Sequence, residues 1–96
     1  MSAQIAAEGG RIRVSGPITF ATAAGLGVAA EQCMTGDVVV DLAAVTEVDS
    51  SALSLLFEWQ RAALRRKCKV SFCNLPASLS SLAELYGVTE LIPAGA

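Results

Sequence analysis

The chain has 96 residues, of which 53% are hydrophobic and 17% are charged, and its formal net charge is −2. This length fits one small domain, 1–96, and the apolar content excludes a disordered chain. The charge argues against nucleic acid as a partner. The absence of histidine excludes Ser-His, Cys-His and His-metal chemistry unless another chain supplies the imidazole.

Two strands are predicted first. Residues 4–8 form a weak extended segment that ends at Gly9-Gly10, a pair that suggests a hairpin turn. Residues 11–14 alternate polar and apolar side chains, as a half-buried strand does. Ser15-Gly16-Pro17 is expected to end this strand, because proline cannot donate to a sheet ladder.

An alanine-rich helix is predicted over 20–33, with Thr19 as its N-cap. Gly25 and Gly27 each weaken it by roughly 1 kcal/mol relative to alanine, and they are expected to permit close packing on a sheet. Its buried side is either Phe20, Ala24 and Val28 or Leu26, Ala29 and Ala30.

The middle of the chain predicts a buried strand and the clearest helix. The three valines at 38–40 are typical of a central strand covered on both faces. Residues 41–48 are of mixed character and lead to a helix that begins within 49–51 and extends to Lys67. The stripe predicted to face the core is Leu53, Leu56, Phe57, Gln60 and Leu64.

The last third predicts a strand over 68–73, with Val70 and Phe72 on one face. Pro76 suits the first turn of the helix that follows, and Gly87 suits its end. The apolar side of that helix carries Leu79, Leu82, Leu85 and Tyr86. Residues 90–92 are expected to form a short edge strand. The order β-β-α-β-α-β-α-β predicts an α/β fold with a small, mostly parallel sheet and helices packed on it.

Two motifs give little support to a cofactor or a metal. Gly25-Leu26-Gly27-Val28-Ala29-Ala30 matches a dinucleotide fingerprint, but the fingerprint needs a turn between strand and helix. Here the glycines lie within a predicted helix. Cysteines at odd separation in one strand point to opposite faces, so the three are interpreted as free thiols: Cys33, Cys68 and Cys73. No cofactor is expected.

Five of the seven basic residues fall between 61 and 69. A structural explanation is favoured, in which cations at the end of a helix complement its dipole. An acidic partner surface or anionic lipid headgroups are the alternative. The five are Arg61, Arg65, Arg66, Lys67 and Lys69.

The segment Asp49-Ser50-Ser51-Ala52 lies at a loop-to-helix junction and has two interpretations. Plain capping needs only side-chain oxygens for the free N–H groups of the first turn. A switch would place a phosphate on a serine there, because those N–H groups and the helix dipole favour an anion. From the residues alone, capping is favoured.

The same helix is expected to present large apolar residues to solvent. At 100° per residue, Leu55, Trp59 and Ala62 fall opposite the predicted core stripe, with Arg66 beside them. Tryptophan and arginine are enriched at interface hot spots, so this face predicts a docking helix. The alternative is a rotated stripe with Trp59 at its margin.

This strand, loop and helix resemble the signature of the STAS domain family, although Ala52 stands where glycine is usual. The resemblance covers almost the whole chain and implies the STAS (SpoIIAA-like) fold and a non-enzymatic interaction module. The residues that carry it are Val38-Val39-Val40-Asp41-Leu42, Val45, Val48-Asp49-Ser50-Ser51-Ala52-Leu53 and Leu85-Tyr86-Gly87-Val88.

Two subfamilies are implied. Anti-sigma-factor antagonists bind an anti-sigma factor that is a serine kinase, and phosphorylation controls them, here at Ser51. MlaB-like proteins are STAS subunits of the Mla phospholipid-transport ABC complex, to which the ending 81–88 is more similar, and there Ser50 would touch the ABC ATPase. With the outer helix face, the expected partner-binding residues are Asp49, Ser50, Ser51, Ala52, Leu55, Trp59 and Arg66. Ser51 and Ser50 are candidate phosphorylation sites.

The N-terminal residues show no basic region followed by an apolar one, and no apolar run approaches the roughly 20 residues that span a bilayer. A cytoplasmic protein is therefore expected, peripheral at the inner membrane when bound to a transporter. A small enzyme is the least supported hypothesis, because no base, nucleophile or metal set accompanies the acidic Glu47 and Asp49.

Overall fold

The computed structural model describes residues 3–95. The strands are β1 (Gln4–Glu8), β2 (Arg11–Ile18), β3 (Val38–Val48) and β4 (Val70–Cys73). The helices are α1 (Ala23–Gln32), α2 (Ser50–Arg65), α3 (Ala77–Leu85) and the 3-10 helix η1 (Thr89–Leu91).

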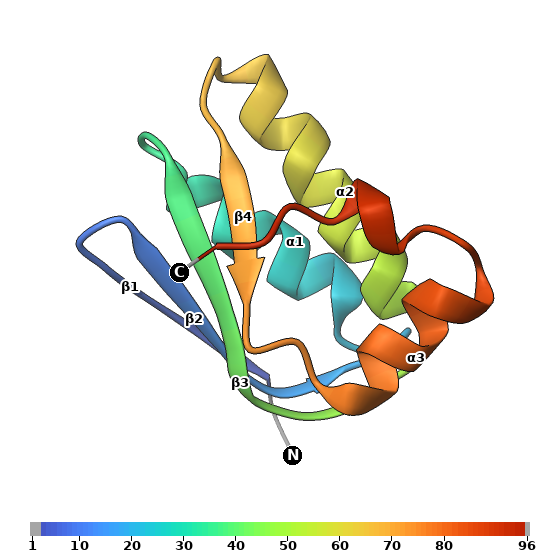
Figure 1. The fold of residues 1–96 in the computed structure, drawn as a ribbon. Helices are drawn as coiled ribbons and strands as arrows, with labels where there is room; N and C mark the ends of the chain where they lie inside the picture. The colour runs from blue at the N-terminus through green and yellow to red at the C-terminus, as the bar shows by residue number, and fades with distance from the viewer. Residues whose placement is uncertain (1–2, 96) are drawn as a thin grey trace.

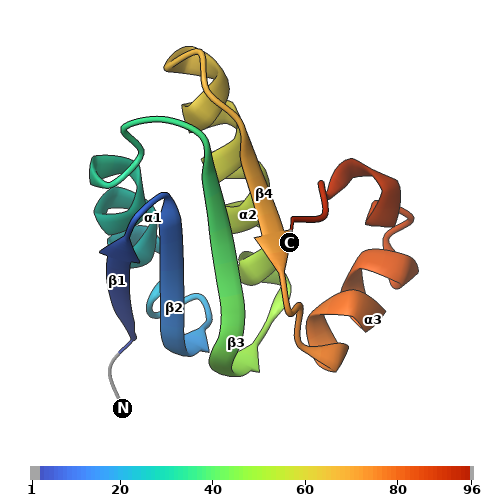
Figure 2. The same cartoon turned by 60° about the vertical axis from the view of Figure 1, so that its left-hand side comes forward.

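The four strands lie in the order β1-β2-β3-β4. β1 pairs with β2 in antiparallel orientation, whereas β2 with β3 and β3 with β4 are parallel, which confirms the predicted α/β class and mostly parallel sheet. Helices α1 and α2 cover one face, and α3 lies beyond β4, beside the first half of α2 (Figure 1). The opposite face carries no helix from residues 3–95 (Figure 2).

The core lies between the sheet and the pair α1 and α2. Strand alternation directs one set of side chains toward the helices, including Ile12 and Val14 of β2 and Val40 and Leu42 of β3. Each of these four is at most 1% exposed. In β4 the predicted pair Val70 and Phe72 is buried as well.

The helix-free face holds a buried carboxylate, Asp41, which is 8% exposed. Its Oδ1 accepts hydrogen bonds from the Asn74 side-chain amide at 3.0 Å and from the Ala43 N–H at 2.9 Å, and Arg11 lies 3.8 Å from its Oδ2. The Asn74 bond, followed by the Ala43 bond, lowers the pKa of Asp41 below the usual 3.8.

Both inner strands are longer than predicted. β2 continues through Pro17 to Ile18, because beyond Ser15 it pairs with β3 alone and proline is tolerated where one side of a strand makes no ladder. β3 continues through 41–48, which pairs with the end of β2 although most of its later side chains are exposed. Backbone pairing, and not side-chain burial, sets its length.

Helix α1 begins later than predicted, and the N-cap is Thr22 rather than Thr19. The Thr19 carbonyl accepts the N–H groups of Thr22 and Ala23, so residues 19–22 form a turn. Phe20 lies in this turn and is 87% exposed, which excludes the first of the two predicted buried sides. Leu26 and Ala30 are buried, as the second predicted.

Two details at the C-terminal end differ from prediction. Residues 90–92 form no strand, and η1 lies there instead, while Ala94 makes a single parallel bridge to Phe72. Leu85 and Tyr86 of the predicted apolar side are 76% and 56% exposed. The buried residues of α3 are Leu79 and Ala83. Gly87 follows α3 with a φ of 70°, as a helix-ending glycine does.

Candidate functional site

Asp49 joins the two loops that follow β2 and β3. It is the N-cap of α2, and its Oδ1 accepts the Ser51 N–H at 2.8 Å. Its Oδ2 accepts the Phe20 N–H at 2.9 Å, and its own N–H donates to the Ile18 carbonyl at 3.3 Å. The capping interpretation is therefore confirmed, whereas the bond to Phe20 was not predicted.

The same bonds hold Asp49 in its charged form. The Phe20 N–H has the largest effect, and with the Ser51 N–H and hydroxyl it keeps the pKa of Asp49 below the usual 3.8, against a smaller opposing effect of desolvation. At neutral pH this carboxylate is ionised, and its orientation is fixed by donors from two elements.

The two serines differ in exposure. Ser50 is exposed and Ser51 half-buried, while Ala52 beneath them is fully buried. Both hydroxyls lie at the N-terminus of a 16-residue helix, where free N–H groups and the dipole favour an anion. Ser54, one turn further, is also exposed.

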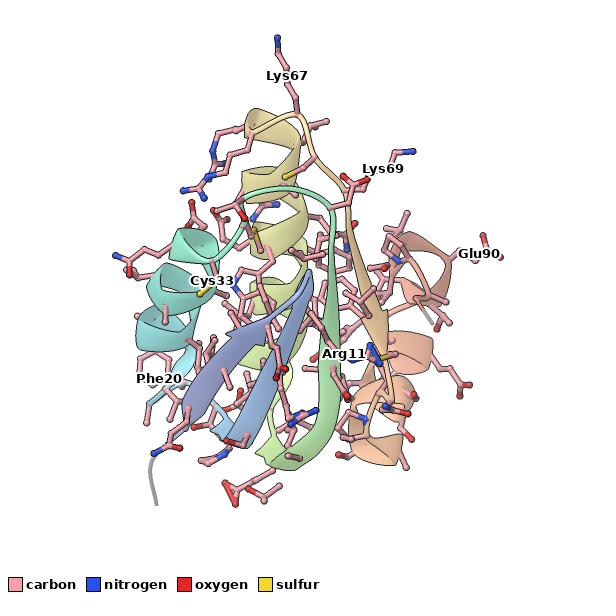
Figure 3. All side chains as sticks on the ribbon, turned by 90° about the vertical axis from the view of Figure 1, so that its left-hand side faces the viewer. Arg11, Phe20, Cys33, Lys67, Lys69 and Glu90 are labelled. Carbon is pink, nitrogen blue, oxygen red and sulfur yellow. The ribbon has the colours of Figure 1, made fainter. Side chains whose placement is uncertain are left out.

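We call Phe20, Asp49, Ser50, Ser51 and Ser54 the α2 N-terminal surface. Figure 3 shows Phe20 at the periphery of the fold, near the start of α1. Sequence reasoning missed Phe20 because it was counted as a helical residue. The signal that could have found it is Thr22, an N-cap type of residue directly before a run of alanines.

Helix α2 buries Leu53 and Leu56 of the predicted core stripe, but it also buries the face that was predicted to be exposed. Leu55 is 6% and Trp59 0% exposed, and Ala62 is buried too, whereas Leu64 of the predicted core stripe is 76% exposed. The prediction of a solvent-facing docking ridge at Leu55 and Trp59 is therefore wrong. The true buried arc is rotated by roughly 90° from the predicted stripe.

The rotation follows from α2 having two neighbours. On one side Leu55 meets α1 at Gly27, where an added Cβ would lie 3.3 Å from Leu55 Cδ1. On the other, Trp59 stacks on Phe72 of β4 with ring centroids 6.5 Å apart. The close packing expected at Gly27 is thus made against a helix and not against the sheet. The buried arc of α2 also contains three small residues: Ala52, Ala62 and Ala63.

The arginines of the basic cluster make contacts within the chain. Arg61 pairs with Glu58 at 2.7 Å, and Arg65 lies 3.5 Å from Glu31. Arg66 donates to the Glu31 carbonyl and, at 3.2 Å, to the Met34 carbonyl, both at the end of α1. The basic cluster therefore has a structural role, as predicted, but the contact differs. The Arg66 side chain binds carbonyls at the end of α1, and not those at the end of its own helix.

The remaining motifs gain no support as sites. The glycines 25 and 27 lie within α1 and not in a strand-to-helix turn. The free thiols of Cys33, Cys68 and Cys73 are half-buried, and Cys68 precedes β4 rather than lying in it. In residues 3–95 no group of three or more Cys, Asp or Glu side chains could hold a metal ion.

None of the helices in the described range 3–95 is long and apolar enough to cross a bilayer.

Two solved structures share this fold. The anti-sigma factor antagonist SpoIIAA in its unphosphorylated form superposes with a TM-score of 0.66 at 11% identity, over 97% of this chain and 86% of that one. The crystal structure of Mglu gives a TM-score of 0.60 at 24% identity, over 77% of this chain. The match spans only 20% of the Mglu chain. The predicted SpoIIAA-like fold is confirmed.

No curated protein sequence matches this chain significantly. A family model described as "Mlab, STAS domain" matches residues 1–93. This match spans nearly all of the sequence and includes the loop that carries Asp49, Ser50 and Ser51. The chain therefore belongs to the STAS family and is of the MlaB type.

Proposed function

We propose that this chain is a non-catalytic, cytoplasmic subunit that docks on the ATPase of a phospholipid-transporting ABC complex and regulates it. The MlaB-type family match supports this class of partner. STAS domains act through protein–protein contacts, and the proposed contact is the α2 N-terminal surface. The observation that carries the proposal is the exposure of Ser50 and Phe20 on either side of the fixed Asp49 carboxylate.

This surface suits recognition because it combines three kinds of contact on a rigid base. Phe20 offers an exposed apolar ring, Ser50 a hydroxyl and Asp49 a negative charge. Leu55 and Trp59 are buried and are not proposed as contacts. The subunit would shift the ATPase only to the extent that it binds one ATPase state more tightly than another, which is how binding becomes regulation.

The test is a pull-down from native membranes with the full chain as bait. The parent protein is expected to recover an ATP-binding-cassette subunit, and Ser50→Glu is expected to lose it through an added charge beside Asp49. Thr35→Glu is the matched control, since Thr35 is also exposed but lies in the loop between α1 and β3. Recovery of no such subunit by the parent, or equal recovery by Ser50→Glu, would contradict the proposal.

The second candidate function is an anti-sigma-factor antagonist switched by phosphorylation of Ser51. One observation favours it: the Ser51 N–H and hydroxyl both act on the Asp49 carboxylate. A phosphate there would add nearly two negative charges beside Asp49 and would weaken its hold on Phe20. The switch would thus reshape the α2 N-terminal surface.

Intact-mass measurement after incubation with candidate serine kinases distinguishes the two functions. Phosphate that is added to the parent and lost in Ser51→Ala supports the switch. If the mass stays unchanged while the same kinases phosphorylate their own control substrates, the switch hypothesis is contradicted.

A further inference from the structure

Thr22 stands at the start of α1, but its hydroxyl does not serve that helix. A threonine in the N-cap position ordinarily accepts an N–H group from the first turn through its hydroxyl oxygen. Among the described residues, the Thr22 side chain caps no such N–H group. Its backbone is helical, with φ −113° and ψ −18°, whereas a capping residue is typically extended.

The Thr22 hydroxyl bonds instead to the loop that leaves β2. Its oxygen accepts the Thr19 N–H at 3.0 Å, three residues back along the chain. The same oxygen lies 2.9 Å from the Pro17 carbonyl and 3.3 Å from the Thr19 carbonyl. A hydroxyl has one hydrogen to donate, which fits the shorter contact, with Pro17. One side chain thus ties the end of β2 to the start of α1, and Phe20 lies between the two.

The turn is also held by its own backbone and by the loop that follows β3. The Thr19 carbonyl accepts the Thr22 N–H at 3.0 Å and the Ala23 N–H at 2.9 Å. From the other side, the Asp49 carboxylate accepts the Phe20 N–H at 2.9 Å. The residues on both sides of Phe20, and Phe20 itself, are therefore fixed by hydrogen bonds.

The side chain carried by this turn points away from the fold. Phe20 is 87% exposed and lies at the periphery of the molecule (Figure 3). A backbone that is ordered before binding removes the entropy that a mobile loop would lose on association, so it strengthens whatever contact the ring makes. The hydroxyl of Thr22 is thus used to order the turn and not to stabilise α1.

We propose that Thr22 is a positioning residue for the α2 N-terminal surface, because its hydroxyl holds the turn 19–22 and so presents Phe20 in the arrangement that a partner binds. Thr22 acts through Phe20 and is not itself a contact. The inference rests on the proposed function for its partner, whereas the ordering of the turn is a property of this chain alone.

Amide exchange, followed by NMR on the full chain, tests the ordering without any partner. Thr22→Val removes the hydroxyl and keeps the branched shape, so exchange at Thr19 and Phe20 is expected to rise roughly threefold or more. Thr22→Ser keeps the hydroxyl and is expected to exchange like the parent. Thr35→Val is the matched control, because Thr35 lies in the loop between α1 and β3, and it should leave both amides unchanged.

The pull-down tests the positioning. Thr22→Val is expected to lower recovery of the ATP-binding-cassette subunit about three- to tenfold, and Thr22→Ser to restore it. In a Phe20→Ala background the same Thr22→Val change should have no further effect, since the ring that it positions is already absent. A merely structural role would lower recovery in both backgrounds. Circular dichroism verifies that each variant is folded.

Unchanged exchange at Phe20 in Thr22→Val, or an equal loss of recovery with and without the Phe20 ring, would overturn the proposal. If the parent recovers no ATP-binding-cassette subunit, the proposed function fails, and the exchange measurement then decides by itself. Exchange at Phe20 that rises in Thr22→Val and returns to the parent value in Thr22→Ser would still support Thr22 as the residue that positions Phe20.

Discussion

The first turn of α2 and its middle turns are held in place by different means. The outer side of the first turn is exposed at Ser50 and is fixed by one carboxylate, whose bonds to Ser51 and Phe20 are 2.8 and 2.9 Å long, while Ala52 and Leu53 on its inner side are buried. The middle turns are held by apolar contact, with Leu56 and Trp59 fully buried. The largest buried side chain of the helix, Trp59, lies in its middle, so we expect stability to depend most on that part, while the outer side of the first turn is available for recognition.

The most severe test of this comparison is Trp59→Ala. Removing a fully buried indole that stacks on Phe72 is expected to cost about 3–5 kcal/mol of unfolding free energy. Urea denaturation measures the loss. Leu64→Ala, on the exposed flank of the same helix, is the control and is expected to stay within about 0.5 kcal/mol of the parent. Equal losses of unfolding free energy for Trp59→Ala and Leu64→Ala would show that α2 buries a different face.

Asp49→Ala is expected to have the next largest effect, because one change removes the acceptor for both the Ser51 and the Phe20 N–H groups. We expect Tm to fall by several degrees and amide exchange to rise at these two residues together. Asp49→Asn keeps one of the two acceptor oxygens, so its Tm should lie between that of Asp49→Ala and that of the parent. A rise in exchange at Ser51 alone would argue against the link to Phe20.

Acid should weaken the same two bonds. The folded-state pKa of Asp49 lies below its unfolded value of about 3.8, and so does that of Asp41. The stability that each carboxylate contributes is therefore fully present above the unfolded pKa and is lost as pH falls through the folded pKa. Urea denaturation between roughly pH 6 and pH 2 should show decreasing stability, and the decrease should be smaller in Asp49→Ala. An identical decrease in that variant would contradict the assignment.

The glycines of α1 offer a matched pair of smaller effects. Gly25→Ala places a methyl group where no atom lies within 4 Å and is expected to gain about 0.5–1 kcal/mol from helix propensity. Gly27→Ala meets Leu55 Cδ1 at 3.3 Å, so part of that gain is lost to the α1–α2 contact. Thermal unfolding of both variants measures the difference. A gain at Gly27 equal to that at Gly25 would mean that α1 and α2 can separate without cost.

The smallest stability effect is expected for Ser50→Ala. The residue is exposed and Asp49 supplies the cap, so unfolding free energy should change by less than about 0.5 kcal/mol. Partner recovery in the pull-down should nevertheless fall. A large stability loss with unchanged recovery would reverse the roles assigned to the first and middle turns.

Local signals predicted α2 well in its limits and poorly in its orientation. Its start at Asp49 follows from capping chemistry, which acts over two or three residues, and it begins within the predicted 49–51. Its buried face depends on what packs against it. The large residues Phe57 and Leu64 drew the predicted stripe to one side, while the buried arc is built partly from alanines that periodicity treats as neutral.

In the candidate site too, the local features could be predicted and the long-range contact could not. The position of Asp49, Ser50 and Ser51 at a helix start could be predicted from the motif. The bond between Asp49 and Phe20 joins residues 29 positions apart and depends on β2 and β3 ending side by side, which no local pattern reports. The full length of β3 escaped prediction for the same reason.

The parallel pairing of β2 with β3 also constrains how this chain reaches its native state. β1 and β2 form a hairpin, a local structure that closes in microseconds. Ile12 of β2 can meet Val40 of β3 only after the intervening chain, with α1, has crossed over the sheet. Such non-local closure is slow, so we expect this crossover, and not the hairpin, to limit the rate of folding.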